Sequence, residues 1–316
     1  MAGLYLVGTL TFIGHVSIDR VENVNGVRVQ PGGAALYSAM AARTLLRDVR
    51  LVSVIGKDYE FLDALKPFYS RSIRVSSMPS TRFHIRYNER WETQYLKVNY
   101  GAGSKITASI IPTKELESTS VVHLSPMHPK KAHSIVDKIK EASPDAKISI
   151  NTWIGYIKEG RKNRQLLKDL ASKTDFFILN ESEAKTLTET DSIPIALRLM
   201  KAKMLIITLG ELGAIINKEN VGMQLVPALT FPSGNVVDTT GAGDTWCGAF
   251  LAAYALTEDL MKSVTCASII SSIKCSGWGF SRLMSLRFKE VDDVLKYVIG
   301  LKEGGLQKTM SDYTEP

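Results

Sequence analysis

The sequence has few of the features that mark secreted, zinc-binding or membrane proteins. Only three cysteines (Cys247, Cys266 and Cys275) occur in 316 residues, and none forms a CxxC pair. A disulfide framework is therefore not expected, and a reducing cytoplasm fits the composition. The apolar opening, residues 1–14, lacks a basic segment, which favours a first strand over a secretory leader. No apolar run approaches the roughly 20 residues of a membrane helix. We expect a cytoplasmic protein with no membrane partner.

Several common catalytic motifs are also missing. The run Gly101–Lys105 resembles a P-loop fragment but lacks its spacing and its Gly-Lys-Ser/Thr ending. His123, His128 and His133 recur every five residues, which does not place them on one helical face as metal ligands. There is no Gly-x-Ser-x-Gly nucleophile elbow. These absences argue against a Walker ATPase, a histidine metal centre and a serine hydrolase of that type.

The positive charge is spread along the chain and not concentrated in one basic segment. The net charge of +7 favours anionic ligands. The densest basic run, Lys158 to Lys168, is interleaved with polar residues and carries no aromatic residues of the kind that single-strand binders use. We interpret it as a solvated helix face, and we expect a small-molecule ligand with no nucleic-acid partner.

Short apolar strands alternate with helical segments through most of the chain. This alternation predicts a single α/β domain, residues 1–316, with a doubly wound, mostly parallel sheet and helices on both faces. A polar tail from Glu303 is expected to fray. The expected strands are Leu10–Gly14, Val49–Ile55, Ser120–Ser125, Lys147–Asn151, Phe176–Leu179, Met204–Thr208 and Ala214–Asn217. The expected helices include Ala34–Leu46, Lys131–Ala142, Arg164–Ser172, Pro194–Met200, Gly243–Leu256, Leu260–Cys275 and Val291–Ile299.

One region departs from this alternation. Residues 82–87 alternate strictly between polar and apolar side chains, residues 88–90 offer a turn, and residues 91–98 are again strand-like. This pattern predicts an antiparallel hairpin. Together with strands around 20–31, the segment 73–100 is expected to form a small β lid over a site, although a hairpin that only covers core surface would show the same pattern.

The most informative segment is Asp238–Leu251, in which Gly241, Ala242 and Gly243 precede Asp244 at the start of a helix. Small residues at a helix start leave backbone amides open to an anion. A carboxylate beside such a cradle suits a base that activates a hydroxyl near a phosphate. Plain turn chemistry, with Asp244 as a helix-start charge, is the alternative.

This segment resembles the C-terminal signature of the ribokinase family, the PfkB-type sugar and nucleoside kinases. The resemblance covers most of the chain, from about Gly14 to the helix after Gly243. It implies a ribokinase-like fold and ATP-dependent transfer of a phosphoryl group to an alcohol, usually with Mg²⁺. It also implies that Asp244 is the base and that the Gly241–Gly243 amides form the anion hole.

Two further segments resemble the nucleotide side of this family. Asn180 and Glu183 match its Asn-x-x-Glu motif, which implies that Glu183 acts near a magnesium ion. A capping box would explain the same spacing. Thr208, Gly210 and Gly213 match a Thr-x-Gly-x-x-Gly loop that runs beside ATP in this family, although such glycines also serve simple turns.

The acceptor side resembles the family's first signature. Asp19 and the pair Gly32-Gly33 imply a site for acceptor hydroxyls, with Tyr37 where related kinases often have Asn, and Asn151 after a strand. We lean toward a sugar or polyol acceptor. A nucleoside acceptor and a non-catalytic binding protein on the same fold remain the alternatives. In this family the lid sometimes serves as a dimer interface, so the lid is also a candidate surface for a homodimer.

Overall fold

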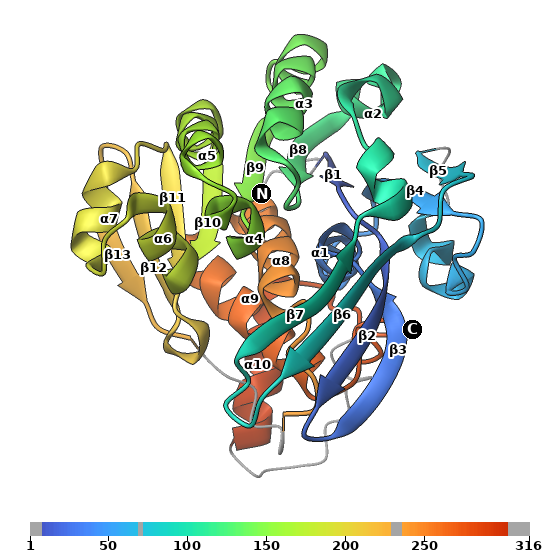
Figure 1. Cartoon of the computed structure of the whole chain (residues 1–316). Helices are drawn as coiled ribbons and strands as arrows, with labels where there is room; N and C mark the ends of the chain where they lie inside the picture. The colour runs from blue at the N-terminus through green and yellow to red at the C-terminus, as the bar shows by residue number, and fades with distance from the viewer. Residues whose placement is uncertain (1–7, 69–71, 229–235, 303–316) are drawn as a thin grey trace.

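The computed structural model describes residues 8–68, 72–228 and 236–302, and these residues form two sheets of different size (Figure 1). The large sheet has nine strands in the order β13-β12-β11-β10-β9-β8-β1-β4-β5. The small sheet has four strands in the order β3-β2-β6-β7 and extends away from the large one. The expected frayed tail from Glu303 lies outside the described residues.

The large sheet is parallel from β5 to β11 and antiparallel at β12 and β13. After β1, the chain adds β4 and β5 on one side and then β8 to β13 on the other, so the order reverses between β1 and β8. In open α/β sheets, ligands bind beyond the carboxyl ends of strands at such a switch point. Its strands are β1 (Thr9–Ile13), β4 (Val49–Gly56), β5 (Ile73–Ser76), β8 (Thr119–Leu124), β9 (Lys147–Asn151), β10 (Phe176–Asn180), β11 (Met204–Thr208), β12 (Ala214–Lys218) and β13 (Gly222–Val226).

Helices cover both faces of the large sheet because successive strand residues point to opposite sides. Phe12 belongs to the core under α1, α8, α9 and α10, whereas Ile13 belongs to the core under α3, α5, α6 and α7. This confirms the expected mostly parallel α/β sheet with two helical layers. The helices are α1 (Ala34–Ala42), α2 (Thr113–Glu117), α3 (Pro129–Ala142), α4 (Ile154–Lys158), α5 (Arg161–Lys173), α6 (Glu181–Thr188), α7 (Ile193–Leu199), α8 (Ala242–Thr257), α9 (Leu260–Cys275) and α10 (Val291–Lys302).

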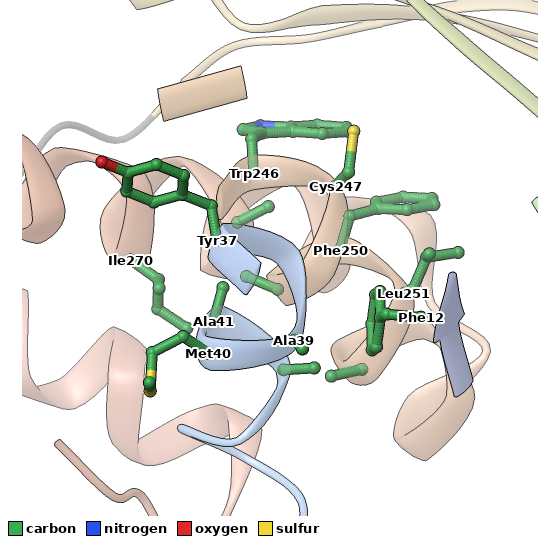
Figure 2. Packing of buried hydrophobic residues seen from close by; sticks show 14 of the residues in the cluster. Phe12, Tyr37, Ala39, Met40, Ala41, Trp246, Cys247, Phe250, Leu251 and Ile270 are labelled. Carbon is green, nitrogen blue, oxygen red and sulfur yellow. The ribbon is translucent and has the colours of Figure 1, made fainter. Parts of the chain in front are cut away.

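Helices α1 and α8 cross at very short range. Figure 2 shows Ala39 and Ala41 of α1 beside α8, with Phe250 and Trp246 projecting from α8. A Cβ atom on Gly248 would lie 1.9 Å from the Ser38 carbonyl oxygen, so only glycine fits at this crossing. This contact fixes the start of α8, which carries the glycine signature, against the start of α1, which follows the Gly32-Gly33 pair.

The small sheet contains β2 (Ser17–Asn23), β3 (Gly26–Gly32), β6 (Thr81–Tyr87) and β7 (Thr93–Asn99). Strands β6 and β7 form the expected antiparallel hairpin. The expected start of the lid at residue 73 needs a correction. Strand β5, Ile73–Ser76, pairs in parallel with β4 and therefore belongs to the large sheet. No helix within the described ranges is long and apolar enough to cross a membrane.

Candidate active site

A cavity of about 290 Å³ opens beyond the carboxyl ends of β8 to β11, between the large and small sheets. Its position agrees with the switch point of the sheet. We call it the acceptor cavity, after the role that the family resemblance implies for Asp19, Gly33 and Asn151, which line it. Most of the residues singled out from the sequence line it: Asp19, Gly33, Tyr37, Asn151, Asn180, Glu183, Thr208, Gly241, Ala242, Gly243 and Asp244.

The glycine turn, Gly241–Gly243, forms one end of the acceptor cavity. Gly241 has a φ of 72°, in the left-handed region, and precedes α8 without any side-chain cap. A Cβ atom on Gly241 would lie 2.3 Å from the Tyr37 ring, whereas one on Gly243 would meet nothing within 4 Å. Tyr37 is therefore the buried floor of the turn, and the space beside Gly243 is open to a ligand. Uncapped amides at a helix start suit an anion.

Asp244 lies in the first turn of α8 and is held in place from two sides. Its Oδ1 atom accepts a hydrogen bond of 2.9 Å from Nδ2 of Asn151, at the end of β9. Its carbonyl oxygen accepts one from the Ser38 hydroxyl in α1. Burial raises the pKa of Asp244 to about 6, although Asn151 and Lys274 act in the opposite direction. A carboxylate with this pKa is suited to accept a proton near neutral pH. The sequence pattern indicated Asn151 as a site residue but gave no sign of its bond to Asp244.

Asp19 is a second buried acid of the acceptor cavity, with 2 % of its surface exposed. Its Oδ1 atom accepts a hydrogen bond of 2.6 Å from the Ser17 hydroxyl. Burial raises its pKa to about 7, and the charges of Asp238 and Asp244 add to this effect. Gly32 does not line the cavity but lies behind Asp19, where a Cβ atom would be 1.9 Å from the Asp19 carboxylate. Gly32 therefore makes room for the acid, whereas a Cβ atom on Gly33 would lie 2.3 Å from the His15 carbonyl oxygen.

Asn180 and Glu183 form a complete capping box at the start of α6. The Glu183 amide donates to the Asn180 side chain at 2.9 Å, and the Asn180 amide donates to Glu183 Oε2 at 3.1 Å. The Thr152 hydroxyl donates to the same oxygen, at 2.9 Å. Burial raises the pKa of Glu183 to about 7. The capping role is thus present, and Glu183 also lines the cavity.

A second cavity, of about 410 Å³, lies on the other side of the glycine turn. Gly210 and Ser271 are among its lining residues, and Thr208, Thr239, Ala242 and Gly243 line both cavities. Gly213 is not part of either lining. A Cβ atom there would lie 2.1 Å from the Val226 carbonyl oxygen at the end of β13. Gly213 therefore allows the close approach of β13 at the start of β12. The two cavities therefore meet at the glycine turn.

A set of aromatic side chains, the aromatic wall, lines the acceptor cavity. We use this name for Phe83, Tyr95, Tyr100, Trp153 and Tyr156, all of which line it. Tyr100 and Tyr156 stack with ring centroids 6.0 Å apart, and Trp153 meets Tyr95 and Tyr156 edge-on at 5.1 and 5.2 Å. The small sheet and the end of β9 both contribute rings. Phe83 and Tyr95 lie on the expected hairpin, whereas Trp153, Tyr156 and Tyr100 lie outside it.

The sequence matches the model of the pfkB family carbohydrate kinase over residues 7–283. A cytidine kinase of Thermococcus kodakarensis is 32% identical over 263 residues, which cover 81% of this chain and 91% of that protein. A ribokinase of Lactococcus lactis subsp. lactis is 25% identical over 290 residues, which cover 85% of this chain and 91% of that protein.

Solved structures show the same fold. A nucleoside kinase from Burkholderia thailandensis, in complex with inosine, superimposes with a TM-score of 0.76 at 19% identity, covering 92% of this chain and 97% of that one. A ribokinase from Giardia lamblia also gives a TM-score of 0.76, at 22% identity, covering 92% of this chain and 99% of that one.

Proposed function

Because the chain belongs to the pfkB family of carbohydrate kinases, we propose that it transfers the γ-phosphoryl group of ATP to a hydroxyl of a nucleoside. Kinases of sugars and kinases of nucleosides both occur among its relatives. The family therefore establishes a phosphotransferase, and the acceptor must be argued from the site.

The aromatic wall is the observation that favours a nucleoside. A nucleobase stacks on aromatic faces, and each such contact is worth about 1–3 kcal/mol. A free sugar can also pack one face on a ring, but its hydroxyls need more hydrogen-bonding groups than five rings offer. Asp19 lines the same cavity as the wall, and a carboxylate there is suited to hold the ribose hydroxyls. The site thus offers both halves of a nucleoside a matching surface, which differs from our sequence-based lean toward a sugar or polyol.

The mechanism follows from the positions of Asp244 and the glycine turn. Asp244 accepts the proton of the acceptor hydroxyl as that oxygen forms a bond to the γ-phosphorus and the bond from phosphorus to the ADP oxygen breaks. The open amides of Gly241–Gly243 stabilise the charge on the phosphoryl oxygens. Since the pKa of Asp244 is about 6, turnover should fall as the pH drops through that value.

The residues around the second cavity fit the phosphate donor. Ribokinase-family kinases use ATP, and the cavity meets the acceptor cavity at the glycine turn. No cluster of three or more His, Cys, Asp or Glu side chains in the described part of the chain could hold a metal ion. Mg²⁺ keeps several waters and is bound by phosphates with one or two carboxylates, so it does not need such a cluster. Glu183 would supply such a carboxylate, and the ion would neutralise charge on the phosphates.

A sugar or polyol acceptor is the second candidate, because Asp19 and the Gly32-Gly33 pair are suited to hydroxyls with or without a base attached. An ADP-release assay with cytidine, inosine, adenosine, ribose and myo-inositol separates the two. We expect turnover with at least one nucleoside at a kcat/KM at least 100-fold above that for ribose. Higher kcat/KM for ribose or myo-inositol would replace the nucleoside assignment.

The aromatic wall gives a second, independent test of the acceptor. Trp153→Ala should raise KM for the nucleoside by about tenfold, the equivalent of one base-stacking contact, while leaving KM for ATP within twofold. An equal effect on a ribose reaction would contradict the stacking role of the wall.

A further inference from the structure

Lys274, near the end of α9, is fully buried. Its ammonium group neither reaches solvent nor lines either cavity. Its Nζ atom donates a hydrogen bond of 2.7 Å to the Asp238 carbonyl oxygen and lies 3.5 Å from Asp238 Oδ2. The same atom lies 5.4 Å from the centre of the Tyr37 ring. A buried charge is costly unless it is paired, so this lysine calls for an explanation.

Asp238 is buried beside it and collects donors from three separate segments. Oδ1 accepts the Thr240 amide at 2.8 Å, just before the glycine turn. Oδ2 accepts Gln30 Nε2 from β3 of the small sheet and the Gly279 amide, both at 2.9 Å. Burial by itself would raise the pKa of Asp238, but Lys274 and these hydrogen bonds bring it below its usual value. The ionised carboxylate therefore joins the glycine turn to the small sheet.

We propose that Lys274 is a positioning residue for phosphoryl transfer, which keeps Asp238 ionised and so holds the glycine turn in its anion-binding shape. A carboxylate offers two oxygens to the three donors, and the adjacent cation offsets much of the cost of burying its charge. Lys274 also donates its hydrogen bond to the carbonyl oxygen of Asp238, which fixes the peptide between Asp238 and Thr239. Tyr37 completes the arrangement, because its ring lies both near Lys274 and beneath Gly241.

The test compares Lys274→Met with Lys262→Met, a control on the same helix. Lys262 is 41% exposed and pairs with Asp292 far from the turn. This inference rests on the proposed phosphoryl transfer, so kcat and both KM values are measured with the best nucleoside. We expect Lys274→Met to lower kcat at least tenfold with KM for the nucleoside within threefold, and Lys262→Met to match the wild type. Unchanged kcat in Lys274→Met, or a loss confined to nucleoside KM, would overturn the inference.

A double variant, Asp238→Asn with Lys274→Met, separates positioning from simple stability. It leaves no unpaired buried charge, so its melting temperature should recover relative to Lys274→Met, which also covers the case in which the single variant does not fold. Its kcat should stay at least tenfold below wild type, because the Asn side chain has one acceptor oxygen for three donors. Wild-type kcat in the double variant would show that the pair serves folding alone. If the wild-type protein shows no nucleoside turnover, that result counts against the proposed function and not against the role of Lys274. The same variants are then compared by their affinity for ADP. This affinity should fall only in the variants that lack Lys274.

Discussion

At the scale of single residues, Asp244 carries the strongest chemical expectation. Asp244→Asn keeps the bond from Asn151, because the new side chain retains an acceptor oxygen, but it cannot take a proton. Loss of a general base should lower kcat by about 10²–10⁴ while the affinity for ADP stays within threefold. Steady-state kinetics and calorimetry measure the two quantities. Near wild-type kcat would remove Asp244 from the mechanism.

Glu183 can be tested against its own capping role. In Glu183→Gln the side-chain oxygen can still accept the Asn180 amide, so the capping box survives. If Glu183 helps to bind Mg²⁺, the Mg²⁺ concentration for half-maximal rate should rise at least fivefold with little change in acceptor KM. Glu181→Gln, in the same turn but paired with Lys185 at the surface, is the control. A change confined to acceptor KM would leave capping as the whole explanation.

The residue-scale features differ in how far they could be predicted. Gly241 and Asp244 are neighbours in the sequence, so their pattern was recognisable. The bond between Asn151 and Asp244 joins residues 93 positions apart, and the contact between Lys274 and Asp238 joins residues 36 positions apart. No local pattern records such distances. Lys274 in particular looks like an ordinary helix lysine until the packing of α9 is known.

At the scale of elements, the crossing of α1 and α8 allows a sharp stability test. Gly248→Val would place side-chain atoms against the Ser38 carbonyl and force the helices apart. Overpacking of this kind costs about 1–3 kcal/mol or more, so we expect a clear fall in the urea midpoint. Gly243→Ala, on the same helix with open space around its Cβ position, should leave the free energy of unfolding within about 0.5 kcal/mol of wild type but reduce turnover, because its methyl group enters the cavity. Equal stability of the two variants would contradict this account of the crossing.

Elements with strong periodic patterns were predicted within a few residues, and short edge elements were not. Helix α9 matches its expected bounds, Leu260–Cys275, and β11 matches Met204–Thr208. Strand β13 was missed because most of its side chains are exposed, so hydrophobic periodicity gives no signal. Strand β5 was assigned to the lid for a related reason: its four residues are partly exposed and indicate no partner.

At the scale of the whole molecule, buried acids and buried histidines change the free energy of unfolding in opposite directions as pH rises. Burial raises the pKa of Asp19, Glu183 and Asp244 to about 7, 7 and 6, so the stability that these groups give at low pH is lost as pH rises through those values. Burial lowers the pKa of His15 and His123 to about 4 and 3, so their contribution is lost as pH falls from about 6.5.

These opposed contributions partly cancel, but the three acids outweigh the two histidines, so we expect a net fall in the free energy of unfolding as pH rises from about 4 to 7. Asp244→Asn removes one acid, so its stability relative to wild type should increase as pH rises from 5 to 8, by about 1.4 kcal/mol for a pKa of about 6. Urea unfolding at several pH values measures the difference. A difference that does not vary with pH would mean that Asp244 has an ordinary pKa.

The meeting of the two cavities at the glycine turn also bears on the kinetic mechanism. If donor and acceptor occupy the two cavities as proposed, neither must leave before the other enters, and the phosphoryl group can pass directly between them. Double-reciprocal plots should therefore intersect, as in a ternary-complex mechanism, and not run parallel as when the protein itself is phosphorylated. A single in-line transfer between the two cavities would also invert the configuration at phosphorus. A donor made chiral at its γ-phosphorus by oxygen isotopes and sulfur should therefore yield product of inverted configuration.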